Sequence, residues 1–329
     1  MIMSFIFKYF ICYPKYNQLM KQETWPELSF EKGNETYQTI HLWTQIAGKI
    51  KLAKMPWINH SWHITLIVTP FGLSTGDIPD LKKHFQINFD FLKHQLQIIT
   101  SDKEERVFPL SGMSVASCYR NILAALKDLK FEIKINPLPC EIENAVPFHE
   151  DENHSTYLPE VAENLHKALL NAQRVFTEFR AKFTGKCSPV HFFWGSFDLA
   201  VSRFSGREAP PHPGGITNLP DWVAKEAYSQ EVCSCGFWAG SEAMPFAAFY
   251  SYIYPAPDGF DSASVKPEAA YWNNEMGEFI LPYKDVQQTE DPSKFLTQFL
   301  DSTYEAAAGF ANWDREKLES RAFLQSGRE

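Results

Sequence analysis

Apolar residues recur every three or four positions in four stretches of the chain, a spacing that predicts amphipathic helices. Three of these helices are expected at residues 37–52, 115–129 and 159–183. The fourth starts at Asp291, because Asp is a preferred helix cap and Pro292 fits the first helical position. The pattern therefore predicts helices both before and after the strand-rich parts of the chain.

Strands are predicted where apolar and polar residues alternate and where aromatic or β-branched residues gather. In the first half they are residues 63–71, 85–91 with 96–98 as a hairpin, and 131–135. In the second half they are residues 191–204, 228–237, 249–254 and 278–283. Because runs of antiparallel-looking strands lie between the helices, the expected fold class is α+β rather than a doubly wound sheet.

The two halves of the chain resemble each other when the sequence is shifted by 133 residues. Six identities fall within 29 ungapped positions, ending with Leu66 on Leu199, Val68 on Val201 and Phe71 on Phe204. Chance would supply roughly two. A second match aligns ERVFPL at 105–110 with EFILPY at 278–283. We therefore predict a tandem duplication of a helix, antiparallel sheet and helix unit, packed with pseudo-two-fold symmetry.

These patterns divide the chain into five segments. They are a non-core N-terminal extension (1–24), a first α+β repeat unit (25–135), an acidic and Pro-rich connector (136–158), a second α+β repeat unit (159–318) and a flexible tail (319–329). The apolar part of the extension is too short to span a bilayer. It is either a weak membrane-surface anchor or a stretch upstream of a start at Met20.

The predicted strand at 191–204 has one apolar face and one mixed face. The mixed face carries Trp194, Ser196, Asp198, Ala200 and Ser202. This face either meets solvent, or contacts the other unit, or lines a ligand cleft. In the last case Trp194 would stack on a ligand, and Ser196 and His63 from the matching strand would add polar groups.

Three side chains are candidates for catalysis, namely Asp198, Glu231 and His154. Asp198 and Glu231 lie inside predicted strands, and two carboxyls in different environments are suited to acid–base chemistry. The alternative for Asp198 is an ion pair with Arg180 or Arg203. Arg203 either binds a carboxylate or phosphate of a ligand or satisfies loop carbonyls.

Metal ligation is a weaker interpretation of the sequence. The stretch PFHEDENHSTYLPE at 147–160 has His and acidic side chains, but it contains no HExxH pattern and no zinc spacing. An acidic loop that precedes the long helix explains it better. Cys233 and Cys235 form C-x-C without a second cysteine pair. We predict no metal site and no cofactor.

The overall composition limits the partners and the compartment. A formal net charge of −9 argues against broad nucleic-acid binding, which requires a basic face. Six cysteines in 329 residues are too few for a disulfide scaffold and suit a reducing cytoplasm. We therefore expect a soluble cytoplasmic protein with no membrane span and no nucleic-acid partner. The sequence gives no prediction of the oligomeric state.

Several stretches resemble a widespread bacterial family of uncharacterised proteins, a domain of unknown function. The most specific is GKCSPVHFFWGSFDLAVSRFSGR at 185–207, and the resemblance covers nearly all of residues 25–318. The family usually has Ser in place of Cys233 and Cys235, which weakens a metal site there. It also favours His154 over His149 as a ligand, but it implies no catalytic role for any position.

Two classes of function remain open. The first is a small-molecule-binding protein or an acid–base enzyme, hydrolase-like, with a polar and aromatic cleft between the two units. The second is a non-catalytic module whose aromatic surface binds another protein. A concave site with converging titratable groups would favour the first, and a flat exposed aromatic patch would favour the second.

Overall fold

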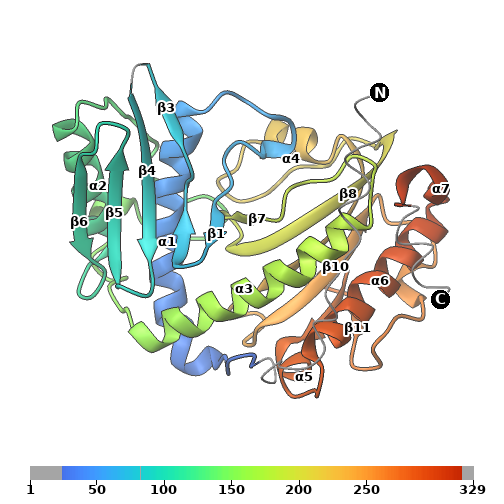
Figure 1. Cartoon of the computed structure of the whole chain (residues 1–329). Coiled ribbons are helices and arrows are strands. Elements are labelled where there is room, and N and C mark those ends of the chain that lie inside the picture. Colours follow the sequence, from blue (N-terminus) through green and yellow to red (C-terminus); the bar gives the residue numbers. More distant parts are fainter. Residues whose placement is uncertain (1–23, 82, 321–329) are drawn as a thin grey trace, which may run out of the picture.

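The computed structural model describes residues 24–81 and 83–320, and it contains two six-stranded antiparallel sheets flanked by helices (Figure 1). The predicted N-terminal extension, except its last residue, and most of the predicted flexible tail lie outside these residues. The helices are α1 (Phe30–Lys54), α2 (Val115–Asp128), α3 (Pro159–Ala181), α4 (Asp221–Ala227), α5 (Tyr283–Gln287), α6 (Pro292–Phe310) and α7 (Arg315–Leu318). Three short 3₁₀ helices are η1 (Asn59–Ser61), η2 (Phe148–Glu150) and η3 (Phe260–Ser262).

The first sheet is built from residues before α2. Its strands are β1 (Ile67–Thr69), β2 (Gly72–Ser74), β3 (Ile78–Asp80), β4 (Lys83–Asp90), β5 (Gln95–Thr100) and β6 (Glu105–Pro109). The order is β1-β2-β4-β5-β6, with β3 paired to β4. In the predicted hairpin, Ile87 lies opposite Ile98 and Phe89 opposite Leu96, and all four are buried. The alternating residues are more polar, as expected of a sheet with one solvated face.

The second sheet follows α3. Its strands are β7 (His191–Phe193), β8 (Asp198–Glu208), β9 (Gln230–Trp238), β10 (Ala248–Tyr254), β11 (Tyr271–Asn273) and β12 (Glu278–Pro282). The order is β11-β12-β10-β9-β8-β7. Figure 1 shows α3 and α6 side by side across one face of this sheet, and both helices contact its central strands. The opposite face is therefore free of these helices.

Helix α1 connects the two halves. Its buried residues lie all around the helix, including Tyr37, Ile40, Trp43 and Ile46, because it contacts α2 and β3 of the first half as well as α3. The Ser29 hydroxyl caps its N-terminus by accepting from the Lys32 N–H. A helix surrounded by protein on all sides loses the amphipathic pattern that surface helices show.

The α+β class is confirmed, and so are the four predicted helices, although α1 begins at Phe30 and not at the predicted residue 37. Asp291 caps α6 as expected and accepts from the Lys294 N–H. Each half of the chain has a long helix, a six-stranded sheet and a second helix in that order. The strand orders of the two sheets differ, so the duplication and the pseudo-two-fold packing stay predictions. The proposed boundaries of the repeat units also stay predictions.

Three strand predictions are wrong. Residues 191–204 do not form one strand but a hairpin, in which β7 turns at 194–197 into β8. Only Ile67–Thr69 forms a strand within the predicted 63–71, because the chain turns through η1 and then reverses at Phe71. Residues 131–135 have no strand partner, and Phe131 is buried because it packs on Phe85, with ring centroids 4.6 Å apart.

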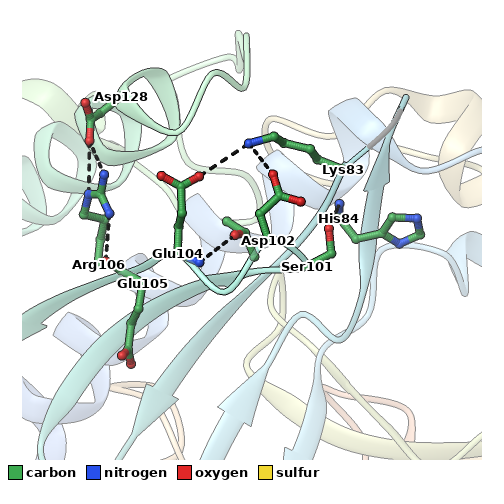
Figure 2. A network of polar contacts seen from close by, with 9 residues as sticks. Lys83, His84, Ser101, Asp102, Glu104, Glu105, Arg106 and Asp128 are labelled. Atoms are coloured by element: carbon green, nitrogen blue, oxygen red, sulfur yellow. Dashed lines mark hydrogen bonds and ion pairs between the residues drawn. The ribbon is translucent and has the colours of Figure 1, made fainter.

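A polar network covers the outer end of the first sheet (Figure 2). Lys83 on β4 pairs with Asp102 at 2.5 Å and with Glu104 at 3.4 Å, across the turn that joins β5 to β6. Arg106 on β6 binds the Asp128 carboxylate at the end of α2. These side chains are partly exposed, so solvent screens the pairs. The network is an ordinary surface feature and not a candidate site.

We expect Lys83→Ala to leave the thermal unfolding midpoint unchanged within experimental error. Exposed ion pairs contribute little because water and salt screen them and because ordering long side chains costs entropy. Thermal melts at low and high salt, with Arg106→Ala as the matched second variant, measure this. A clear fall of the midpoint for Lys83→Ala at high salt would contradict the assignment of a surface role.

Candidate functional site

A cavity of about 1130 Å³ lies on the face of the second sheet that α3 and α6 leave uncovered. Its walls come from β8, β9 and β10, from α1, from residues 139–146 of the connector and from α4. Residues of both predicted units and of the connector therefore meet around one space. Its volume slightly exceeds that of typical small-molecule pockets.

The alternation of β8 decides which side chains enter the cavity. Asp198, Ala200 and Ser202 line it, whereas Leu199 and Val201 between them are fully buried on the helix-covered face. Across the sheet, the Ser202 hydroxyl lies 2.9 Å from that of Ser234 on β9. The polar residues that made the sequence unusual thus form part of a cavity wall.

The connector brings a carboxyl group to this wall. The Gln45 side chain on α1 donates to the Cys140 carbonyl and accepts from the Cys140 N–H, both at 2.9 Å. The next residue, Glu141, donates its N–H to the Thr217 carbonyl at 2.8 Å. Glu141 has a left-handed backbone with φ 60°, which is uncommon for a residue other than glycine. Such strained residues cluster at functional sites.

The turn between β7 and β8 receives the Glu141 carboxyl. At Gly195 a Cβ atom would lie only 2.0 Å from Glu141 Oε1, so the glycine allows this close approach. Phe197 in the same turn also has a left-handed backbone, with φ 58°, although it is buried. Its ring packs on Phe192 and on His41, which fixes the conformation of the turn.

Asp198, the first residue of β8, is 6% exposed. Its Oδ2 accepts a hydrogen bond from the Tyr250 hydroxyl on β10, two strands away. The Tyr250 ring crosses the intervening β9 at Gly236, where a Cβ atom would lie 2.4 Å from the ring. The other oxygen of Asp198, Oδ1, has no hydrogen-bond partner among the described residues.

Three carboxyls of the cavity have raised pKa values. Burial raises the pKa of Asp198 to about 6, that of Glu141 to about 7 and that of Glu278 to about 8. The negative charge of Asp198 adds to the rise at Glu141 and Glu278. The Tyr250 and Ser196 hydroxyls act in the opposite direction on the pKa of Asp198. Although protein surrounds these side chains, Glu141 and Ser196 are exposed and Glu278 is half-buried, because all three border the cavity.

His41 on α1 lies beside the same turn. Its Nε2 is 2.8 Å from the Gly195 carbonyl oxygen. Burial lowers the pKa of His41 to about 4, although hydrogen bonds to the Gly195 and Trp194 backbone oppose this shift. At neutral pH the imidazole is therefore uncharged, and it does not neutralise the carboxyls.

Four of the seven residues singled out in the sequence line the cavity, namely His154, Trp194, Ser196 and Asp198. Trp194 donates its indole N–H to the Ile64 carbonyl at 2.8 Å and packs on α1 at Gly48, where no Cβ would fit. His154 lies 2.7 Å from the Asp151 carboxylate, which also lines the cavity.

The other three do not line the cavity, so they do not share a site with these four as predicted. The Arg203 side chain is buried on the helix-covered face, where it donates to the Phe179 carbonyl. Glu231 points to the same side of β9 as Cys233 and pairs with Arg207 at 2.6 Å. The imidazole of His63 packs on Trp57 and accepts from the Ile58 N–H at 3.2 Å.

The sequence did not indicate Glu141, Glu278 and Tyr250 as site residues. Glu141 lies in a connector without regular structure, so no periodicity indicates its direction. For Glu278 a signal existed, since it begins a predicted strand and is the equivalent of Glu105 in the second internal match. The described residues contain no group of three or more His, Cys, Asp or Glu side chains arranged to hold a metal ion.

Two glycines at the site are expected to respond differently to alanine. In Gly195→Ala the new methyl group meets only the end of the flexible Glu141 side chain, so the unfolding free energy should change by less than about 0.5 kcal/mol. In Gly236→Ala it meets the Tyr250 ring and the Leu199 carbonyl at 2.6 Å, and we expect a loss of about 1–3 kcal/mol.

Urea unfolding of both glycine variants beside the parent measures these free energies. Equal stability of the two variants would show that the Tyr250 ring does not cross the sheet at Gly236.

Within the described part of the chain, no helix is long and apolar enough to cross a membrane. Comparison with curated proteins and with solved structures gives no match. A family model does match, and it spans residues 25–320. The chain therefore belongs to the family described as "Family of unknown function (DUF5996)", in agreement with the resemblance seen in its sequence.

Proposed function

We propose that this protein binds a small organic molecule in the cavity and acts on it by general acid–base catalysis. The observation that carries the proposal is the convergence of Asp198, Glu141 and Glu278 on one cavity, with pKa values of about 6, 7 and 8. General acids and bases work best when their pKa lies near the working pH. Carboxyls with such values cluster at functional sites.

The different pKa values suggest different roles for the two carboxyls on the sheet. At pH 7 Asp198 is mostly ionised and can accept a proton, whereas Glu278 is mostly protonated and can donate one. Hydrolysis is a reaction that needs only these groups. Asp198 would take a proton from the attacking water, and Glu278 would give a proton to the leaving group. Tyr250 would orient Asp198 through its hydrogen bond.

A thermal-shift screen against a broad metabolite panel tests the binding. A ligand present at about a hundred times its dissociation constant adds roughly 2.7 kcal/mol, which raises the unfolding midpoint by several degrees. We expect hits for the parent that Asp198→Asn loses. Glu231→Gln is the matched control, because it neutralises a carboxyl on the same sheet but outside the cavity, and it should retain them.

Two results would count against the proposal. One is a panel without hits for the parent. The other is a set of hits that Asp198→Asn binds as well as the parent does, since the ligand would then occupy another place.

A second candidate function is protein interaction, because the molecule also has an exposed aromatic patch. Trp57, Ile58 and Trp222 are 43%, 43% and 57% exposed, and the two indole rings lie 5.0 Å apart. The patch is small, so the cavity is the stronger candidate. A cytoplasmic location and the absence of a cofactor stay predictions from the sequence.

A further inference from the structure

The cavity wall is strongly acidic. Six carboxyl side chains line it, namely Glu141, Glu143, Asp151, Asp198, Glu242 and Glu278. Among the described residues, no lysine and no arginine lines it. At pH 7 Asp198 is mostly ionised and Glu278 mostly protonated, and a bound cation would favour the ionised form of both. The wall therefore suits cations better than phosphate or carboxylate groups. Arg203, which had suggested an anionic ligand in the sequence, does not line the cavity.

The histidines of the wall do not offset these charges. Burial lowers the pKa of both His41 and His60, so both imidazoles are mostly uncharged at neutral pH. His154 is paired with the Asp151 carboxylate. The Lys186 Nζ lies 2.5 Å from His60 Nε2, but Lys186 does not line the cavity.

A second observation points to a missing hydrogen-bond donor. Asp198 Oδ1 is buried and has no partner among the described residues, although Oδ2 is bound by Tyr250. A buried carboxylate oxygen without a donor costs free energy, and native structures rarely leave one unsatisfied. An ammonium group has three N–H donors and a positive charge, and so it meets both needs.

Aromatic side chains stand next to the carboxyls. Tyr250 and Tyr252 stack with ring centroids 6.1 Å apart, and Trp194 and Trp238 also line the cavity. Ring faces attract cations and also bury apolar surface. Carboxyls combined with aromatic rings suit a molecule that has a charged nitrogen and an apolar body.

We propose that the ligand of this cavity is an organic cation, an amine with an apolar body, whose ammonium group lies among the carboxyls of Asp198, Glu141 and Glu278. This inference rests on the small-molecule site proposed above and names its ligand class. The ammonium group donates to Asp198 Oδ1, while the body extends along Ser202 and Ser234 of the sheet. The cavity volume leaves room for an extended body.

Calorimetric titration with matched probes tests the ligand class. Each set has an amine, a neutral analogue and an acid of similar shape, such as tryptamine, 3-ethylindole and indole-3-propionate, and further sets have longer bodies. We expect the amines to bind at least about tenfold more tightly than their neutral analogues, and the acids not to bind. Asp198→Asn and Glu278→Gln should each weaken amine binding by about tenfold or more, and Glu231→Gln should not.

Three results would overturn the inference, and the first two separate it from the proposed function. In the first, neutral or acidic probes bind as tightly as amines, and Ser202→Phe, which places a large side chain in the cavity, abolishes this binding. The small-molecule site then stands, and the proposal of a cationic ligand is wrong. In the second, no amine binds, but the metabolite screen gives hits that Asp198→Asn loses. The proposal of a cationic ligand is then wrong as well. Amine binding that Asp198→Asn and Glu278→Gln leave unchanged would place the ammonium group elsewhere and overturn its assignment.

Discussion

Arg203→Ala is expected to lower the free energy of unfolding by about 3 kcal/mol or more. Arg203 is 2% exposed, and its guanidinium lies 3.4 Å from the centroid of the Phe179 ring and 4.2 Å from that of Tyr304. The side chain thus fills the space between β8 and the helices α3 and α6. Alanine would leave a cavity there and remove the cation–π contacts.

Arg203→Met separates the packing role of this side chain from its charge. No carboxylate pairs with Arg203 among the described residues, and burial lowers the pKa of its guanidinium. Methionine keeps much of the volume and removes a buried charge, which is often neutral or stabilising. We therefore expect Arg203→Met to recover most of the stability that alanine loses.

Urea unfolding of the parent and both Arg203 variants measures these differences. Equal loss in the methionine and alanine variants would show that the charge, rather than the packing, stabilises this layer. Cavity binding should persist in Arg203→Met, because the side chain lies on the other face of the sheet.

Between pH 4 and pH 8 the free energy of unfolding of Asp198→Asn is expected to rise by about 3 kcal/mol relative to that of the parent. In the folded parent the pKa of Asp198 is raised from its ordinary value of 3.8 to about 6. The folded state therefore holds this proton more tightly than the unfolded state. The resulting stability is fully present below pH 4 and is lost as the pH rises through 6.

The amide of asparagine does not titrate, so the variant lacks this loss. Glu141 and Glu278 shift in the same direction as Asp198, and the parent should therefore lose further stability as these two ionise. Urea unfolding of parent and variant at pH 4, 6 and 8 measures the difference. A gap between the two proteins that stays constant with pH would contradict the burial of an ionisable Asp198.

The regular elements were the most predictable part of the fold. The helix α3 has a continuous apolar stripe that includes Leu165, Leu169 and Phe176, and the Asp291–Pro292 pair marks the start of α6. Such signals are local, so one sequence is enough to identify them. The α+β class followed from the order of these helices and the strand runs.

The hairpin of β7 and β8 shows where local signals fail. The turn at 194–197 contains the pair Gly195-Ser196, a known hairpin signal, but the alternation of apolar and polar residues continues through it. The turn also holds Phe197 in a left-handed conformation, which no local pattern indicates. Tertiary contacts of its ring with Phe192 and His41 hold that conformation. Alternation alone therefore merged two strands into one.

The candidate site was predictable only in part. The alternation of β8 correctly separated Asp198 and Ser202 from Leu199, since neighbouring side chains of a strand point to opposite faces. The same alternation places Glu231 on the face of β9 opposite to Val232 and Ser234, which line the cavity. The sequence could not show this, because the register of β9 against β8 depends on contacts between the two strands. Glu141 required the long-range contacts of Gln45 and Thr217.

The central claim is that three carboxyls of one cavity titrate near neutral pH, as acid–base groups must. Carbon-13 NMR titration of the Asp and Glu side-chain carboxyls, in the full chain from about pH 3 to pH 10, tests it most directly. We predict three carboxyls with midpoints near 6, 7 and 8, which disappear one at a time in Asp198→Asn, Glu141→Gln and Glu278→Gln. Titration of these three groups at the ordinary midpoints of solvated carboxyls would contradict the account.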